Sequence, residues 1–140
     1  LMRIIIRKVN NRIDNEKCIF IRREVFIKEQ NIPESLELDD NKIESIKFLA
    51  TYDNESIGTA RYRATSKGMK LERFAVIKQY RGYGVGKALV LFILEELKME
   101  ESIYLHAQES VIKFYTKLGF KIVGDRFFEA DIPHIKLIKK

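Results

Sequence analysis

The sequence predicts an α/β fold in which a mixed β-sheet is flanked by helices, and three observations favour it. Short apolar segments of strand length recur along the chain and are separated by turn-forming residues. Other segments repeat apolar residues at helical spacing. No internal repeat, low-complexity tract or linker interrupts the sequence, so residues 1–140 are expected to form a single domain.

The first half of the chain predicts one strand, one helix and three further strands. An apolar-rich strand is expected at 3–9, and a helix at 14–30, where Cys18, Val25 and Phe26 share one face. Pro33 then begins a predicted loop. Turn residues divide the following stretch into strands at 46–52, 56–64 and 69–76.

The second half predicts two helices and a group of short strands. Residues 84–99 are apolar nearly all round, as in a helix buried on a sheet. A short buried strand is expected at 103–106. A helix is expected at 109–118, because Val111, Phe114, Tyr115 and Leu118 share one face before Gly119 ends it. Two or three short strands are predicted between residues 121 and 138.

The composition limits the class of protein. With 46% hydrophobic and 33% charged residues, the chain is expected to be globular rather than disordered. The longest apolar run, 88–94, is too short to span a bilayer, and no secretory signal is evident, so no membrane partner is expected. A lone Cys18 allows no internal disulfide and no cysteine-based metal cluster, which favours a cytoplasmic protein without a metal.

The net charge of +6 is unevenly distributed along the chain. Residues 29–44 carry six acids and one lysine, a local charge of −5, so the remaining residues sum to +11. A basic remainder of this kind suits a polyanionic ligand, such as a nucleotide, a phosphorylated cofactor or nucleic acid.

The stretch QYRGYGVGKALV, residues 79–90, places three glycines between a predicted strand and a predicted buried helix. A Walker loop is excluded by Arg81 and Ala88, and a dinucleotide fingerprint by Lys87 and Leu89. The N–H groups at a helix N-terminus nevertheless attract phosphate, and glycines allow its close approach. From this pattern alone, a phosphate-binding loop and a turn without a ligand remain equally open.

Several ordered motifs resemble those of the GNAT acyltransferases. RGYGVG at 81–86 resembles the family's R-x-x-G-x-G acetyl-coenzyme A (acetyl-CoA) loop, and FYTKLGF at 114–120 resembles its FYxKLGF helix. Segments at 25–33, 58–61, 105–108 and 132–134 resemble the bacterial ElaA/YjcF-like branch. The resemblance covers almost the whole chain and favours a phosphate-binding loop.

This resemblance implies a GNAT fold and an N-acetyltransferase that moves an acetyl group from acetyl-CoA to a small-molecule or protein amine. It implies direct attack in a ternary complex by a monomer or homodimer. Main-chain groups of the strand at 74–76 are implied to bind the thioester, and the glycine loop the pyrophosphate. The residues implied to bind the cofactor are Phe74, Ala75, Val76, Arg81, Gly82, Tyr83, Gly84, Val85, Gly86, Lys87, Gln108, Phe114 and Lys117.

Direct attack needs a proton donor for the departing thiolate and a base for the amine. Tyr115 matches the family's proton-donating tyrosine, although its spacing alone favours a core residue. Glu72, on the strand beside the implied thioester site, is the first candidate base, and Glu29 is its competitor. Either could instead be a solvated surface carboxylate.

The residues implied to bind the acceptor are Glu29, Gln30, Glu37 and His134. The resemblance places the acidic segment beside the acceptor entrance, where it would form an anionic rim that favours cationic amines; its acids could equally be solvated loop charges. His106, in an apolar strand, is expected to be a satisfied core histidine.

Two other classes of function remain as alternatives. A nucleic-acid-binding module could use the basic remainder, with Tyr80, Tyr83, Phe127 and Phe128 as stacking groups. No RNA- or DNA-binding motif supports this, so no nucleic-acid partner is expected. A non-catalytic CoA-binding regulator would keep the glycine loop but lack turnover.

Overall fold

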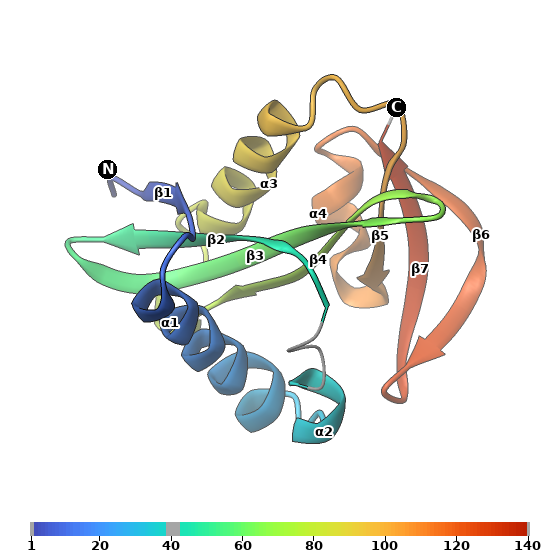
Figure 1. Ribbon diagram of the computed structural model, residues 1–140. Helices are drawn as coiled ribbons and strands as arrows, with labels where there is room; N and C mark the ends of the chain where they lie inside the picture. The colour runs from blue at the N-terminus through green and yellow to red at the C-terminus, as the bar shows by residue number, and fades with distance from the viewer. Residues whose placement is uncertain (1, 39–42, 140) are drawn as a thin grey trace.

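The protein is built on one seven-stranded mixed sheet, as the computed structural model, which describes residues 2–38 and 43–139, shows in Figure 1. All neighbouring strands are antiparallel except the central pair β4–β5, so the predicted mixed sheet flanked by helices is confirmed. In the order β1-β2-β3-β4-β5-β7-β6, the strands are β1 (Ile5–Lys8), β2 (Ile46–Tyr52), β3 (Glu55–Thr65), β4 (Gly68–Val76), β5 (Ile103–Gln108), β7 (Ile132–Lys139) and β6 (Phe120–Glu129).

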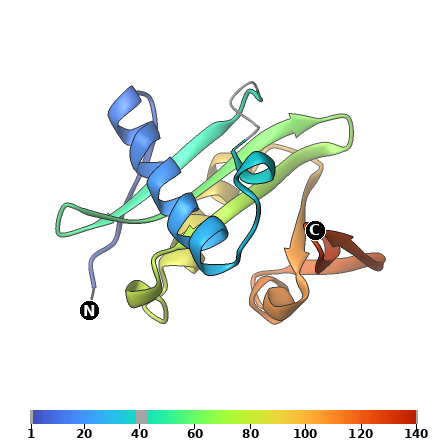
Figure 2. The ribbon, with the colours of Figure 1, turned by 90° about the horizontal axis from the view of Figure 1, so that it is seen from below.

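Helices cover the two faces of the sheet. Helix α1 (Arg12–Arg22) lies against β2–β4 on one face and α3 (Val85–Glu96) on the opposite face, here called the α1 face and the α3 face (Figure 1). Helix α4 (Ile112–Thr116), after the 3₁₀ turn Glu109–Val111, packs with β5–β7 (Figure 2). No helix in the described ranges is long and apolar enough to cross a membrane.

The helix predicted at 14–30 differs from the observed one at both ends. It begins at Arg12 because the side chain of Asn11 accepts a hydrogen bond from the Asp14 N–H and caps the first turn. After Arg22 it continues as a π-helix, Arg23–Glu29. Val25 and Phe26 are both buried in this π-helical part, so the shared face predicted for Cys18, Val25 and Phe26 is confirmed, although the π-helix itself was not predicted.

The loop predicted after Pro33 contains a short helix, α2 (Glu34–Glu37). Pro33 fits the position just before this helix, since its fixed φ leads into the first turn and its missing N–H costs nothing there. Asp39 and Asp40, two of the acids in the same segment, lie outside the described residues.

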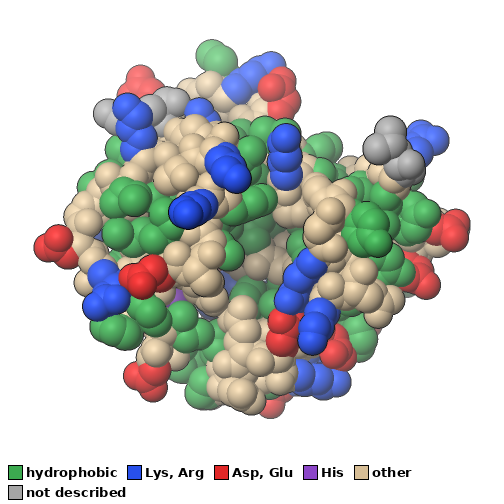
Figure 3. Space-filling view, turned by 180° about the vertical axis from the view of Figure 1, so that it is seen from behind, with side chains coloured by type: hydrophobic (Ala, Val, Ile, Leu, Met, Phe, Trp, Pro, Cys, Tyr) green, Lys and Arg blue, Asp and Glu red, His purple; other side chains and the backbone are tan. Residues whose placement is uncertain are grey.

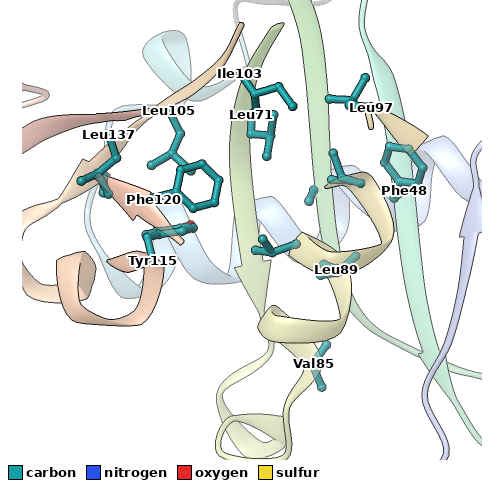
Figure 4. Close-up of a cluster of buried hydrophobic side chains, with 14 of the residues drawn as sticks. Phe48, Leu71, Val85, Leu89, Leu97, Ile103, Leu105, Tyr115, Phe120 and Leu137 are labelled. Atoms are coloured by element: carbon teal, nitrogen blue, oxygen red, sulfur yellow. The ribbon is translucent and has the colours of Figure 1, made fainter. Parts of the chain in front are cut away.

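Apolar side chains form a separate cluster on each face of the sheet. On the α3 face, Leu89 and Ile93 pack on Phe48 and Leu71 (Figure 4). On the α1 face, Cys18 is fully buried and confirmed as a core residue. The predicted burial of the helix at 84–99 on the sheet is confirmed for Val85, Leu89, Val90 and Ile93. Leu91, Phe92, Val111 and Phe114 are exposed on α3 or near α4.

The central parallel pair parts half-way along β4. Strands β4 and β5 pair from Met69↔Ile103 to Leu71↔Leu105, yet β4 runs on to Val76. Arg73 has the left-handed φ of 59°, and the β3–β4 register shifts opposite it, so β4 carries a β-bulge at this point. A bulge increases local twist and turns β4 away from β5.

A buried group of charges joins this bulge to the helices. Glu37 of α2 accepts from Nε of Arg22 at 2.6 Å and lies 3.2 Å from Nε of Arg73, and both Arg22 and Glu37 are almost fully buried. The main-chain carbonyl of Glu37 also accepts from Arg22 at 2.6 Å. Three elements, α1, α2 and β4, are therefore held together by one carboxylate.

Replacing this carboxylate is expected to destabilise the fold. Glu37→Gln keeps the side-chain volume but removes the charge that compensates two arginines, which should lower the free energy of unfolding by about 3–5 kcal/mol. The control is Glu34→Gln, because Glu34 pairs with Arg23 at the surface, where a pair contributes about 1 kcal/mol or less. Urea unfolding of both variants tests this, and equal losses would contradict it.

Candidate active site

The parting of β4 from β5 leaves main-chain groups of residues 73–76 without a strand partner on the β5 side. Strand pairing on the other side continues, with Thr59↔Ala75 and Gly58↔Val76. Unpaired main-chain donors and acceptors at the centre of a sheet need water or a ligand as a partner. The strand predicted to bind the thioester is thus the one whose edge is open.

Aromatic side chains line the α3 face of this opening. The ring of Tyr115 packs edge-on against Phe74 of β4 at 6.0 Å and Phe114 at 4.9 Å. It also packs edge-on against Phe120 at 5.8 Å, beside which it is drawn in Figure 4. Burial raises the pKa of the Tyr115 phenol, so it stays protonated at neutral pH. Its hydroxyl has no hydrogen-bond partner among the described residues, although its ring is part of the core. The predicted acid and the predicted thioester strand are in contact.

The glycine loop leads from β4 into α3 and has open space beside two of its glycines. Gly82 and Gly84 have φ of 85° and 84°, and a Cβ on either would meet no atom within 4 Å. Gly84 directly precedes the first residue of α3, so the free N–H groups of that helix begin here. A Cβ on Gly86 would lie 3.4 Å from Phe114, which brings the loop against α4. These distances describe a loop suited to a bulky anion.

Two lysines beside this loop are available for an anion. Lys87, in the first turn of α3, and Lys117, at the end of α4, are exposed and form no ion pair with the described residues. Seen from behind, the molecule is hollowed near its centre, and Lys and Arg side chains stand on both sides of the hollow (Figure 3). Tyr83 and Gly82 of the loop line a surface cavity of about 680 Å³ together with Tyr80 and Met2.

An ion pair joins Arg81 to Glu29. The sequence predicted that Arg81 binds the cofactor and that Glu29 binds the acceptor. The guanidinium donates to both Glu29 carboxylate oxygens at 2.5 and 2.7 Å and to the carbonyl of Val76 at 3.0 Å. The hydrogen bonds from Arg81 lower the pKa of Glu29. Glu29 is therefore a weak base that fastens the end of the π-helix to the glycine loop.

Glu72, the first candidate base, lies in a cationic cluster. Arg61 donates to its carboxylate at 2.7 Å and Arg63 at 3.0 Å, and Lys70 lies 3.6 Å away. Burial raises the pKa of Glu72, but the charges of Arg61 and Arg73 outweigh this effect, and its pKa falls below the ordinary value. A carboxylate that its neighbours keep ionised takes up a proton poorly. The arginines around Glu72 therefore make it an unfavourable general base.

Three of the four described acids in the segment predicted to form an anionic rim are paired with arginines. Glu37 is buried between Arg22 and Arg73, Glu34 pairs with Arg23, and Glu29 pairs with Arg81. The prediction summed the charge of residues 29–44 alone, and the arginines that pair with these acids lie outside that segment. Glu37 is thus corrected from a substrate contact to a structural residue.

Two predicted site residues bridge the opening on the α1 face. Gln108, at the end of β5, donates to the side-chain oxygen of Gln30 at 2.9 Å, and Gln30 follows the π-helix. His134 stands next to Gln108 in the β5–β7 register and is buried. Its Nδ1 donates to the Ile132 carbonyl at 2.7 Å. Gln30, Gln108 and His134 thus border one side of the opening together.

His106 is not the core histidine that its apolar strand predicted. Ile103, Leu105 and Ala107 belong to the cluster on the α3 face, so His106 projects to the α1 face, where it is partly exposed. Its Nδ1 lies 2.9 Å from Glu129 at the end of β6, and its ring packs edge-on against Phe127 at 4.9 Å. The alternation of residues 103–108 carried the signal for this orientation, but nothing in the sequence linked His106 to Glu129.

Comparison with known proteins identifies the family. The model of the acetyltransferase (GNAT) domain matches residues 9–140. The chain belongs to the GNAT acetyltransferases. The Bacillus subtilis protein named "Uncharacterized protein YyaT" is 38% identical, and the match covers 96% of this chain and 95% of YyaT. "Uncharacterized N-acetyltransferase YjcF" of the same organism is 35% identical over 87% of this chain and 89% of its own.

Solved GNAT structures share the fold. Escherichia coli ElaA superposes with a TM-score of 0.86 at 25% identity, covering 99% of this chain and 100% of ElaA. A GNAT family acetyltransferase from Elizabethkingia anophelis, solved with acetyl-CoA bound, gives a TM-score of 0.72 at 16% identity over 98% of this chain and 97% of its own. The resemblance to GNAT proteins of the ElaA/YjcF-like branch is confirmed.

Removing the Tyr115 hydroxyl is expected to leave stability unchanged. Tyr115→Phe should alter the free energy of unfolding by less than about 0.5 kcal/mol, because no hydrogen bond to a described residue is lost. The matched control is Tyr104→Phe, whose hydroxyl bonds to Thr65 Oγ1 at 2.7 Å and should contribute about 0.5–1.5 kcal/mol. Urea unfolding compares the two; a larger loss for Tyr115→Phe would show that its hydroxyl is structural.

Proposed function

We propose that this GNAT protein is an acetyl-CoA-dependent N-acetyltransferase that acts on an amine by direct attack in a ternary complex. The observation that carries the proposal is the meeting of three features at one opening. They are the unpaired edge of β4 at 73–76, the open glycine loop at the start of α3, and Tyr115 against Phe74. The GNAT neighbour solved with acetyl-CoA supports the same cofactor.

The cofactor is proposed to span from the glycine loop to the edge of β4. Main-chain N–H groups of the loop and the first turn of α3 would bind the pyrophosphate, with Lys87 and Lys117 adding charge. Main-chain groups at 74–76 would bind the pantetheine and the thioester, and an N–H there could stabilise the developing oxyanion. Arg81 contributes by fixing the loop through Glu29 and the Val76 carbonyl.

Tyr115 is proposed to donate the proton that the departing thiolate requires. The reaction forms a C–N bond and breaks the C–S bond, so the sulfur leaves as a thiolate unless it is protonated. Burial keeps the phenol protonated, and no described residue occupies its hydroxyl. The acceptor, a small-molecule or protein amine, would enter on the opposite, α1 face, where Gln30, Gln108 and His134 meet.

The proposal is tested by assaying acetyl-CoA turnover against a panel of amines and following the release of free thiol. The panel spans polyamines, amino acids, aminoglycosides, arylamines and peptide N-termini. Turnover that depends on an amine, with a product heavier by one acetyl group, is the expected result. Binding of acetyl-CoA without turnover for any amine would favour a CoA-binding regulator instead.

A carboxylate placed at the glycine loop is expected to abolish cofactor binding. Gly86→Glu would put a negative charge and a bulky side chain where the helix N-terminus is proposed to bind phosphate. We expect acetyl-CoA affinity to fall by more than about tenfold, or about 1.4 kcal/mol. The control Leu91→Glu adds the same charge to an exposed position further along α3 and should bind normally. Calorimetry on folded variants measures both.

The proton donor is tested by turnover of Tyr115→Phe. Loss of a positioned proton donor typically lowers the rate by about 10²–10⁴-fold, so kcat should fall within this range. The affinity for acetyl-CoA should stay unchanged, because the aromatic ring remains. Single-turnover measurements ensure that the chemical step is observed, and a wild-type rate in this variant would return Tyr115 to a purely structural role.

A further inference from the structure

The α1 face of the opening carries a carboxylate–histidine pair that the resemblance to the family did not assign. Glu129 Oε1 lies 2.9 Å from Nδ1 of His106, which stands one residue beyond the last pairing of β4 with β5. Since an ionised carboxylate only accepts, the neutral form of His106 carries its hydrogen on Nδ1 and its lone pair on Nε2. No described residue forms a hydrogen bond with this Nε2, and the side chain is 24% exposed.

Other carboxylates near the opening are poor proton acceptors by comparison. Glu29 is bound by Arg81, Glu37 lies between Arg22 and Arg73, and Glu72 is bound by Arg61 and Arg63. Each of these carboxylates is compensated by arginine, which does not give up its proton. Glu129 instead hydrogen-bonds to the imidazole of His106, which can take up and release a proton.

His134, the other histidine, is less suited to take up a proton from a substrate. Its Nδ1 is committed to the Ile132 carbonyl, its Nε2 faces Glu129 at 3.9 Å, and the residue is buried. The Glu129 carboxylate thus lies between the two rings, and only His106 presents an outward lone pair. Phe127 packs against both rings and holds the arrangement, at 4.9 Å from His106 and 6.0 Å from His134.

The His106–Glu129 pair lies on the side of the opening from which the acceptor amine would approach. The glycine loop, α3 and Tyr115 lie on the α3 face, so the cofactor would occupy that side of the opening. An amine that attacks the same thioester must come from the α1 face, to which His106 and Gln108 project. Building on the proposed acetyl transfer, we propose that His106 is the general base for the acceptor amine and that Glu129 positions it.

The amine nitrogen attacks the thioester carbonyl and passes one proton to Nε2 of His106, while Nδ1–H stays hydrogen-bonded to Glu129. The thiolate takes its proton from Tyr115, and both residues exchange with water after product release. The charged and titratable groups that face His106 are Tyr104 on its own strand, Glu129 of β6, His134 and Lys136 of β7, and Lys70 of β4.

The first test compares kcat over pH for the wild type, His106→Gln and Glu129→Gln, using the amine that the panel identifies. His106→Gln should lower kcat by about 10²-fold and abolish the fall of kcat toward acid pH, with acetyl-CoA affinity unchanged. Glu129→Gln should lower kcat less, because the amide oxygen can still accept the hydrogen bond from Nδ1 of His106 while the negative charge is lost. Glu95→Gln, an exposed carboxylate on α3, is the control with wild-type behaviour expected.

The second test does not need turnover. The chain has two histidines, so the imidazole signals can be followed by NMR and assigned with His106→Gln. The ring-nitrogen chemical shifts of His106 should show its hydrogen on Nδ1, and they should change in Glu129→Gln and stay constant in the control. A wild-type kcat and acid limb in His106→Gln would overturn the inference while the acetyltransferase proposal stands. If the wild type turns over no amine, both this inference and the acetyltransferase proposal are overturned. If His106→Gln loses activity only because it unfolds, as circular dichroism would show, His106 is a structural residue and the inference is also overturned.

Discussion

The parting of β4 from β5 is the constraint on which the rest of the site depends. A parallel pair at the centre of a sheet would normally satisfy its main-chain groups along its whole length. Here the pairing stops at Leu71↔Leu105, and the bulge at Arg73 turns β4 aside. The left-handed backbone of a non-glycine residue is unfavourable by itself, and the buried contact of Arg73 with Glu37 fixes the side chain of this residue.

Charge pairing divides the surroundings of the opening into two kinds of group. The acids nearest to β4 are compensated by arginines and serve to fasten α2, the π-helix and the glycine loop to the sheet. Lys87, Lys117 and the His106–Glu129 pair are not committed to structure in this way. The cations lie beside the glycine loop and the histidine pair on the α1 face, which matches a polyanionic cofactor on one side and an amine on the other.

The sequence predicted the structure best where residues close together in the chain determine it. The positive φ of Gly82 and Gly84 and the apolar helix that follows are encoded within a few residues, and the contact of Tyr115 with Phe74 follows from family motifs. The partners of Glu37 and His106 could not be predicted in this way. Glu37 meets Arg22 and Arg73 through three separate elements, and Glu129 reaches His106 only through the curvature of the β6–β7 hairpin. Such pairs depend on tertiary packing that no spacing along the chain records.

The central claim is that acetyl-CoA completes the sheet along the open edge of β4. Amide hydrogen exchange, measured residue by residue with and without saturating acetyl-CoA, tests it most directly. Slower exchange is expected at amides within 73–76 and in the glycine loop at 82–86, with no change in β2, which has a strand partner on both sides. Binding of acetyl-CoA that leaves exchange at 73–76 unchanged would contradict it.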